Sequence, residues 1–312
     1  MSTATFPRPR SAGPVLALLV NAFVWGVSWW PFRHLQAMGL HPLWATTVIY
    51  VLSAAAIALW RPAALRQVAT QPALWLIFLA SGTTNATFNW SVSIGDVVRV
   101  VLLFYLMPLW AMLLARVILK EPLTRASVAR VACALVGAAL VLSQGAEGSA
   151  AAPAASGFAS RWFALPDLLA IVGGFAFALN NVMLRREAAQ PEEGRALAMF
   201  LGGAAVAGVT AATLSAGASG VAGVQWPVAA SAWALPAFGL AIAFMVSNLC
   251  LQYGAARLSA TATAVVMPCE VLFAALTSVW WGGATLHASV LAGGTLILLA
   301  TLASVFDGQR GH

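Results

Sequence analysis

Residues 97–116 read VVRVVLLFYLMPLWAMLLAR, and Arg99 and Arg116 are the only charged side chains in this stretch. A helix of about 20 apolar residues crosses the roughly 30 Å hydrocarbon core of a bilayer. The whole chain has the same character, because 61% of its 312 residues are hydrophobic and only 8% are charged. A soluble domain has about 25% charged residues. Lipid must therefore be the solvent for most of this chain.

Ten stretches approach the length of a membrane-spanning helix. In chain order they are 14–32, 42–60, 72–93, 97–116, 127–144, 166–184, 196–215, 232–251, 259–281 and 287–306. Backbone polar groups in lipid must be satisfied within the segment, so each stretch is expected to be helical. The sequence predicts an all-α integral membrane protein with ten transmembrane helices.

The basic residues predict an orientation. If the N-terminus is cytoplasmic, thirteen Lys and Arg residues lie on the cytoplasmic side, and only Arg33, Arg99 and Arg161 lie on the other. Cytoplasmic loops are enriched in Lys and Arg. We therefore expect a multi-pass protein of the bacterial inner (plasma) membrane with both termini in the cytoplasm. The basic residues are scattered along the chain, so nucleic acid is not expected as a partner.

The two halves of the chain resemble each other. In the sixth stretch, Phe177, Asn180 and Arg185 repeat the spacing of an aromatic, a polar and an Arg residue in the first stretch. Five spans are an odd number, so the second half enters the membrane from the opposite face. We expect two inverted five-helix repeats, 1–144 and 165–312, joined by a flexible outer-face linker, 145–164. Secondary transporters hold their substrate between such repeats, near the midplane.

Three motifs carry a resemblance to a known family. They are Trp25-Gly26, Pro108 followed by Lys120-Glu121-Pro122-Leu123-Thr124, and Glu270-Val271-Leu272-Phe273-Ala274-Ala275-Leu276. In this order they resemble the ten-helix EamA-type members of the drug/metabolite transporter superfamily. The chain departs from the family pattern at Lys120, Val271 and Ala284, where the family has Gly, Pro and Glu. The resemblance implies a transporter, often an exporter, of amino acids or other small metabolites, and not an enzyme.

Polar residues inside the apolar stretches are the candidate site. A polar group in hydrocarbon is costly unless it faces protein or water. The candidates for substrate binding are Trp25, Ser28, Asn85, Asn89, Tyr105, Asn180, Asn181, Asn248, Gln252 and Glu270. Glu270 could bind a proton or a cationic group of the substrate, which would couple transport to the proton gradient. The alternative for every one of these residues is a hydrogen bond that only packs helices together.

Asp96 and Arg99 are expected to pair at the outer mouth, since residues three apart share a helix face. Arg99 would there attract a carboxylate, unless the pair only anchors the helix at the interface. Two further expectations concern packing and solvent. Gly202, Gly203, Gly293 and Gly294 are expected to permit close helix packing, and the four His residues, near ends and loops, to be solvated.

No cofactor or metal is expected, because the chain has neither a phosphate-binding Gly-Lys loop nor ligands at metal-binding spacing. The expected partners are a small-molecule substrate and the lipid bilayer, with the chain as a monomer or a homodimer. Two other classes stay open. One is an integral-membrane enzyme that acts on lipid-type substrates, and the other is a membrane sensor or assembly subunit.

Overall fold

The computed structural model describes 12–120, 164–187, 190–216, 224–227, 230–255, 269–283 and 287–307, with scattered positions between 125 and 140 and position 266. Every regular element within these ranges is a helix. Most of the fifth predicted span and of the linker lies outside the described residues. The same is true of the first part of the ninth predicted span.

The helices of the first half follow the predicted stretches closely. They are α1 Ala12–Val27, α2 Trp29–Ala37, α3 Pro42–Trp60, α4 Ala63–Thr70, α5 Pro72–Ile94, α6 Val97–Phe104, α7 Met107–Leu114 and the π-helix η1 Ala115–Leu119. A proline opens both α3 and α5, where its missing N–H costs no hydrogen bond. Two predicted spans are interrupted, the first at Ser28 and the fourth at Tyr105 and Leu106.

The second half contributes longer helices. They are α10 Leu165–Arg186, α11 Glu192–Ala216, α12 Ala234–Ala255, α14 Cys269–Gly282 and α15 Ala288–Asp307. These coincide with the sixth to tenth predicted stretches, apart from the part of the ninth that is not described.

Six helical segments of the described chain are long and apolar enough to cross a membrane. They are Gly13–Ala37, Pro42–Trp60, Val97–Leu119, Leu165–Leu184, Glu192–Ala216 and Ala234–Leu251. The helices Cys269–Gly282 and Ala288–Ala300 are apolar but shorter. The polar α5 is not among the six, although it has 23 residues. A multi-pass membrane protein follows from these helices, whereas the number ten stays a prediction.

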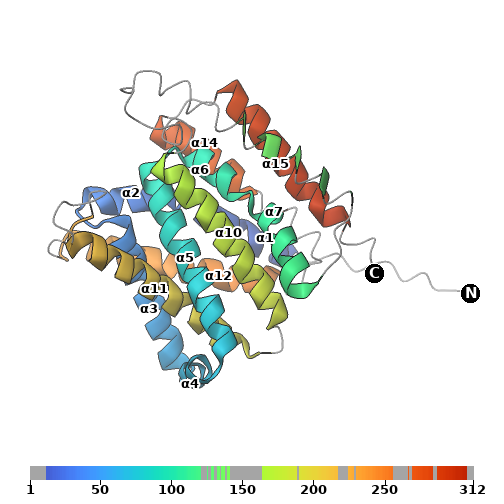
Figure 1. Cartoon of the computed structure of the whole chain (residues 1–312). Helices are drawn as coiled ribbons and strands as arrows, with labels where there is room; N and C mark the ends of the chain where they lie inside the picture. The colour runs from blue at the N-terminus through green and yellow to red at the C-terminus, as the bar shows by residue number, and fades with distance from the viewer. Residues whose placement is uncertain are drawn as a thin grey trace, which may run out of the picture.

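The two halves are interleaved around α5. This helix packs against α10 on one side and against α11 on the other, and Figure 1 shows α5 and α10 running side by side. Its buried positions include Ser81, Asn85, Asn89 and Ser93. The polar residues of α5 therefore face protein, which explains why a central helix of a membrane bundle can have a low hydropathy. A second junction joins α1 to α12 and α14.

Glycines allow the halves to approach closely. A Cβ atom on Gly82 would lie only 2.7 Å from the carbonyl carbon of Gly202, and one on Gly203 would lie 2.7 Å from Cε1 of Tyr50. A Cβ on Gly294 would lie 2.9 Å from Leu102. The prediction that these glycines permit close packing is confirmed for Gly202, Gly203 and Gly294.

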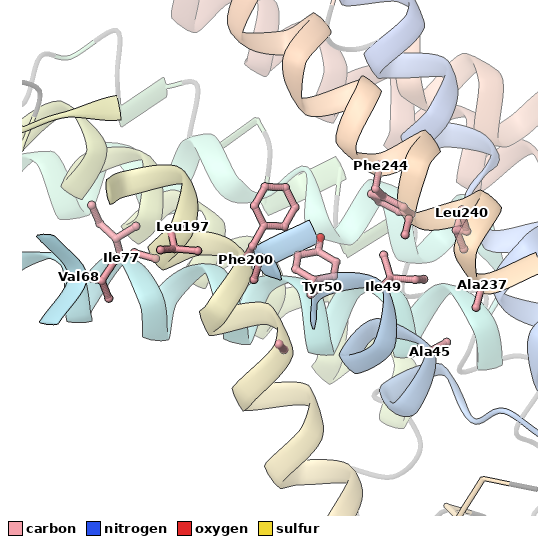
Figure 2. Packing of buried hydrophobic residues seen from close by; sticks show 14 of the residues in the cluster. Ala45, Ile49, Tyr50, Val68, Ile77, Leu197, Phe200, Ala237, Leu240 and Phe244 are labelled. Carbon is pink, nitrogen blue, oxygen red and sulfur yellow. The ribbon is translucent and has the colours of Figure 1, made fainter. Parts of the chain in front are cut away.

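A buried apolar cluster joins α3, α4 and α5 to α11 and α12. Figure 2 shows Phe200 of α11 beside Tyr50 of α3, with Leu240 and Phe244 of α12 close to Ile49. These side chains belong to both halves, so the halves share a core in this region.

His41 corrects one expectation from the sequence. Its side chain is 6% exposed, whereas a solvated His was expected. Nδ1 accepts a hydrogen bond from Leu43 N over 3.2 Å, which caps α3, and the ring contacts Trp90. Burial lowers the pKa of this imidazole to about 4, because the charged form is poorly solvated there.

Candidate functional site

A cavity of about 110 Å³ lies between the two halves. Its lining residues are Asn21, Trp25, Tyr50, Ser81, Thr84, Asn85, Phe88, Phe104, Tyr105, Met107, Phe177, Asn180, Met199, Phe200, Phe244, Asn248, Leu251 and Glu270. They come from α1, α3, α5, α6 and α7 in the first half and from α10, α11, α12 and α14 in the second. A cavity of this size holds several waters or a small solute.

Seven aromatic side chains form a continuous chain of contacts along the cavity wall, which we call the aromatic arc. In order of contact they are Phe177, Phe104, Phe88, Trp25, Phe244, Tyr50 and Phe200. Neighbouring ring centroids are 4.7 to 6.3 Å apart, with rings tilted or edge to face. These are the arrangements that the ring quadrupole favours. Each ring comes from a different helix, so the arc depends on the whole bundle.

Two amides of the wall are held by hydrogen bonds. Asn21 Nδ2 donates to Ser247 O over 3.1 Å and to Ser247 Oγ over 2.7 Å, which ties α1 to α12. Asn85 Nδ2 donates to Ser81 O over 2.8 Å, and its Oδ1 accepts a hydrogen bond from the Tyr50 hydroxyl. Both amides are thereby fixed in orientation.

Other polar atoms of the wall have no partner in the described structure. Asn21 Oδ1 and Asn180 Oδ1 are buried and accept no hydrogen bond. Leaving a buried acceptor unsatisfied costs about 1–3 kcal/mol. A bound ligand that donates a hydrogen bond would remove this cost.

Glu270 provides the only carboxyl group among the described lining residues, and none of them is Lys, Arg or His. Its side chain is buried, at 7% exposure, and Tyr105 donates a long hydrogen bond to Oε2 over 3.4 Å. No basic side chain forms an ion pair with Glu270 in the part of the chain that the structure describes.

The break between α6 and α7 places Tyr105 in the wall. Pro108 lies in the first turn of α7, and a proline has no N–H to donate to the carbonyl four residues earlier, here that of Phe104. α10 approaches this carbonyl closely, because a Cβ on Gly174 would lie 2.6 Å from Phe104 O. The sequence therefore interrupts the helix at the height of the cavity.

Comparison with known proteins agrees with this architecture. Residues 13–143 match the EamA-like transporter family. We call these matched residues the EamA-like domain. This domain is consistent with the drug/metabolite transporter superfamily.

No curated protein matches the chain. A solved structure described only as "Crystal structure of protein" is similar, with a TM-score of 0.58 and 20% identity. The likeness covers 97% of this chain and 99% of that one. At this identity it shows a shared fold alone, which extends beyond the EamA-like domain through the second half.

Six of the ten candidates from the sequence line the cavity. In the EamA-like domain these are Trp25, Asn85 and Tyr105, and in the second half they are Asn180, Asn248 and Glu270. Their role in substrate binding stays a prediction.

Of the other four candidates, the three whose side chains the structure describes do not line the cavity. Ser28 donates to Trp25 O over 2.7 Å at the break between α1 and α2. Asn89 is fully buried and donates to Thr46 Oγ1 over 3.0 Å, so it joins α5 to α3 within the EamA-like domain. Asn181 is exposed on α10, and the side chain of Gln252 lies outside the described residues.

Tyr50 and Phe200 are lining residues that were not predicted. A spacing signal existed for Tyr50, because Thr46, Tyr50 and Ser53 are all buried on one face of α3. Nothing in the sequence distinguished Phe200 from an ordinary core residue.

The expected ion pair between the side chains of Asp96 and Arg99 is not formed. Asp96 instead caps α6, where its Oδ1 accepts from Arg99 N over 2.8 Å. The Arg99 guanidinium binds Asp167 of α10 with two hydrogen bonds of 2.7 and 2.9 Å. Asp167 is 2% exposed and also accepts from Ala164 N over 3.0 Å. The pair therefore joins the EamA-like domain to the second half.

Proposed function

We propose that the protein is a secondary transporter that exports small polar metabolites such as amino acids by alternating access, coupled to protons through Glu270. The observation that carries this proposal is the cavity shared by both halves, with one buried carboxyl group in its wall. The EamA-like domain supports transport rather than enzymatic chemistry. Substrate, direction and coupling belong to the proposal.

Alternating access needs two similar halves that can move against each other. We therefore retain the predicted architecture of ten helices in two inverted repeats, 1–144 and 165–312, in the bacterial inner membrane with cytoplasmic termini. The interleaved helices and the shared cavity support this arrangement. In it the chain acts without a cofactor, and the site is complete within one copy, as a monomer or within a homodimer.

The position of the cavity supports a state that is closed at the Arg99 end of the bundle. At that end, Val92, Val97, Val98 and Val101 are buried in an apolar cluster. The ion pair with Asp167 lies at the same end. Asn180 lies near the opposite, Arg186 end of α10, which the distribution of basic residues predicts to be cytoplasmic. We infer that this conformation exchanges solute with the cytoplasmic side.

Replacement of Glu270 tests whether transport is coupled to protons. Purified protein is reconstituted into proteoliposomes, a pH gradient is imposed, and uptake of radiolabelled amino acids and amines is measured. We expect Glu270→Gln to abolish gradient-driven accumulation while the protein still folds and elutes as wild type. Glu192→Gln removes an exposed carboxylate from the first turn of α11 and is the matched control. Equal accumulation by wild type and Glu270→Gln would remove Glu270 from the mechanism, and no flux of any solute by wild type would reject transport.

A further inference from the structure

The charges and hydrogen-bonding groups of the cavity wall determine which kind of solute it can bind. Among the described lining residues, Glu270 is the only acidic group and no basic side chain is present. A solute carboxylate placed here would meet a like charge and no cation, which is unfavourable in a site of low dielectric constant. A positively charged solute would instead give Glu270 a cationic partner, which the described lining residues do not supply.

Two buried acceptor atoms of the wall have no hydrogen-bond partner among the described residues. Asn21 cannot reverse its amide to offer a donor, because Nδ2 already faces the carbonyl oxygen of Ser247, which can only accept. Its Oδ1 is left without a partner, as is Oδ1 of Asn180. The amide of Asn85 is engaged at both ends. An ammonium group has three N–H donors and no acceptor, so it matches these atoms and the Glu270 carboxylate.

The aromatic arc suits the rest of such a solute. Seven rings along one wall offer an apolar surface for a hydrocarbon body and ring faces that attract a cation. The thioether side chains of Met107 and Met199 add adaptable apolar contacts at the same cavity.

We propose that the cavity selects organic monocations: primary amines with an apolar or aromatic body and no carboxylate. Glu270 and the Oδ1 atoms of Asn21 and Asn180 would receive the ammonium group, and the aromatic arc would receive the body. This inference rests on the proposed transport function for its physiological meaning. It narrows the proposed substrates from zwitterionic amino acids to amines of net positive charge.

Three ligands with the same phenyl body and different charges test this proposal. They are 2-phenylethylamine as the cation, phenylalanine as the zwitterion and 3-phenylpropionate as the anion. Binding to the purified full-length wild-type protein in detergent is measured by calorimetry and by thermal shift. We expect 2-phenylethylamine to bind at least about tenfold more tightly than phenylalanine, and 3-phenylpropionate not to bind. This comparison needs no variant, so a folding defect cannot obscure it.

Variants then test whether Glu270 is the residue that binds the ammonium group. Glu270→Gln is expected to reduce the affinity for 2-phenylethylamine at least about tenfold, and Glu192→Gln to leave it unchanged. Equal or tighter binding of phenylalanine, binding of 3-phenylpropionate, or failure of the amine to bind wild type would overturn the inference. Transport is scored separately in proteoliposomes. Amine binding without flux contradicts the proposed function alone, whereas amino-acid flux without amine binding contradicts this inference alone.

Discussion

The crossing of α5 and α11 leads to a quantitative prediction about Gly202. A Cβ atom at this position would lie 2.7 Å from the carbonyl carbon and 2.9 Å from the Cα atom of Phe78, whereas ordinary contacts begin at 3.4 Å. These are backbone atoms and cannot move aside by a change of rotamer. Gly202→Ala must therefore push the two helices apart, and overpacking of this kind costs about 1–3 kcal/mol.

Gly239 of α12 provides the matched control. A Cβ atom there would meet nothing within 4 Å, so Gly239→Ala should show only the gain in helix propensity, about 0.5–1 kcal/mol. Unfolding of the purified proteins in mixed micelles, followed by Trp fluorescence during SDS titration, would measure both changes. Both variants gain the same helix propensity, so we expect Gly202→Ala to be less stable than Gly239→Ala by about 1–3 kcal/mol, the cost of overpacking. A Gly202→Ala protein as stable as Gly239→Ala would refute the close packing of the two halves.

Two further predictions concern charge. Arg99→Gln leaves Asp167 buried without its partner and should lower the free energy of unfolding in the same titration by about 3–5 kcal/mol; Arg186→Gln, which breaks an ion pair whose Arg side chain is 57% exposed, should change it by at most about 1 kcal/mol. If the two losses are equal, the Arg99 pair is not a buried link between the halves. Because the pKa of His41 in the folded state is about 4, below its unfolded value of about 6.5, its stabilising contribution is complete above pH 6.5 and is lost as the pH falls toward 4. The melting temperature should therefore fall over this range in wild type and fall less in His41→Asn, which keeps a capping side chain without a titrating ring. If the melting temperatures of the two proteins fall equally with pH, His41 does not titrate as proposed.

The sequence predicted the helices better than the site. Predicted span 42–60 coincides with α3, and span 72–93 differs from α5 by one residue at its end. Lipid forces long apolar runs to be helical, so their positions are fixed locally by composition. Breaks were harder to predict, because Ser28 and Tyr105 interrupt runs that remain apolar on both sides.

Partners across the bundle were not predictable. The spacing of Asp96 and Arg99 suggested a local pair, but Asp167 lies 68 residues beyond Arg99 in the chain. Asn85 and Asn89 belong to one stripe on α5, yet only Asn85 lines the cavity, while Asn89 binds Thr46. A periodic pattern gives the face of a helix, whereas the depth at which the cavity meets that face depends on how the other helices pack.

The aromatic arc is the clearest case of a site that no single helix encodes. Its contacts cross between the halves at three places: Phe104 with Phe177, Trp25 with Phe244, and Tyr50 with both Phe200 and Phe244. Each aromatic pair contributes only about 0.5–1.5 kcal/mol beyond the area that it buries. One ring contact can therefore break and another form at small cost while the rest of the arc stays in place. The backbone contacts at Gly202 allow no such rearrangement. The wall of the cavity can therefore change shape at modest cost while α5 and α11 stay together, which allows the wall to adjust to a bound solute.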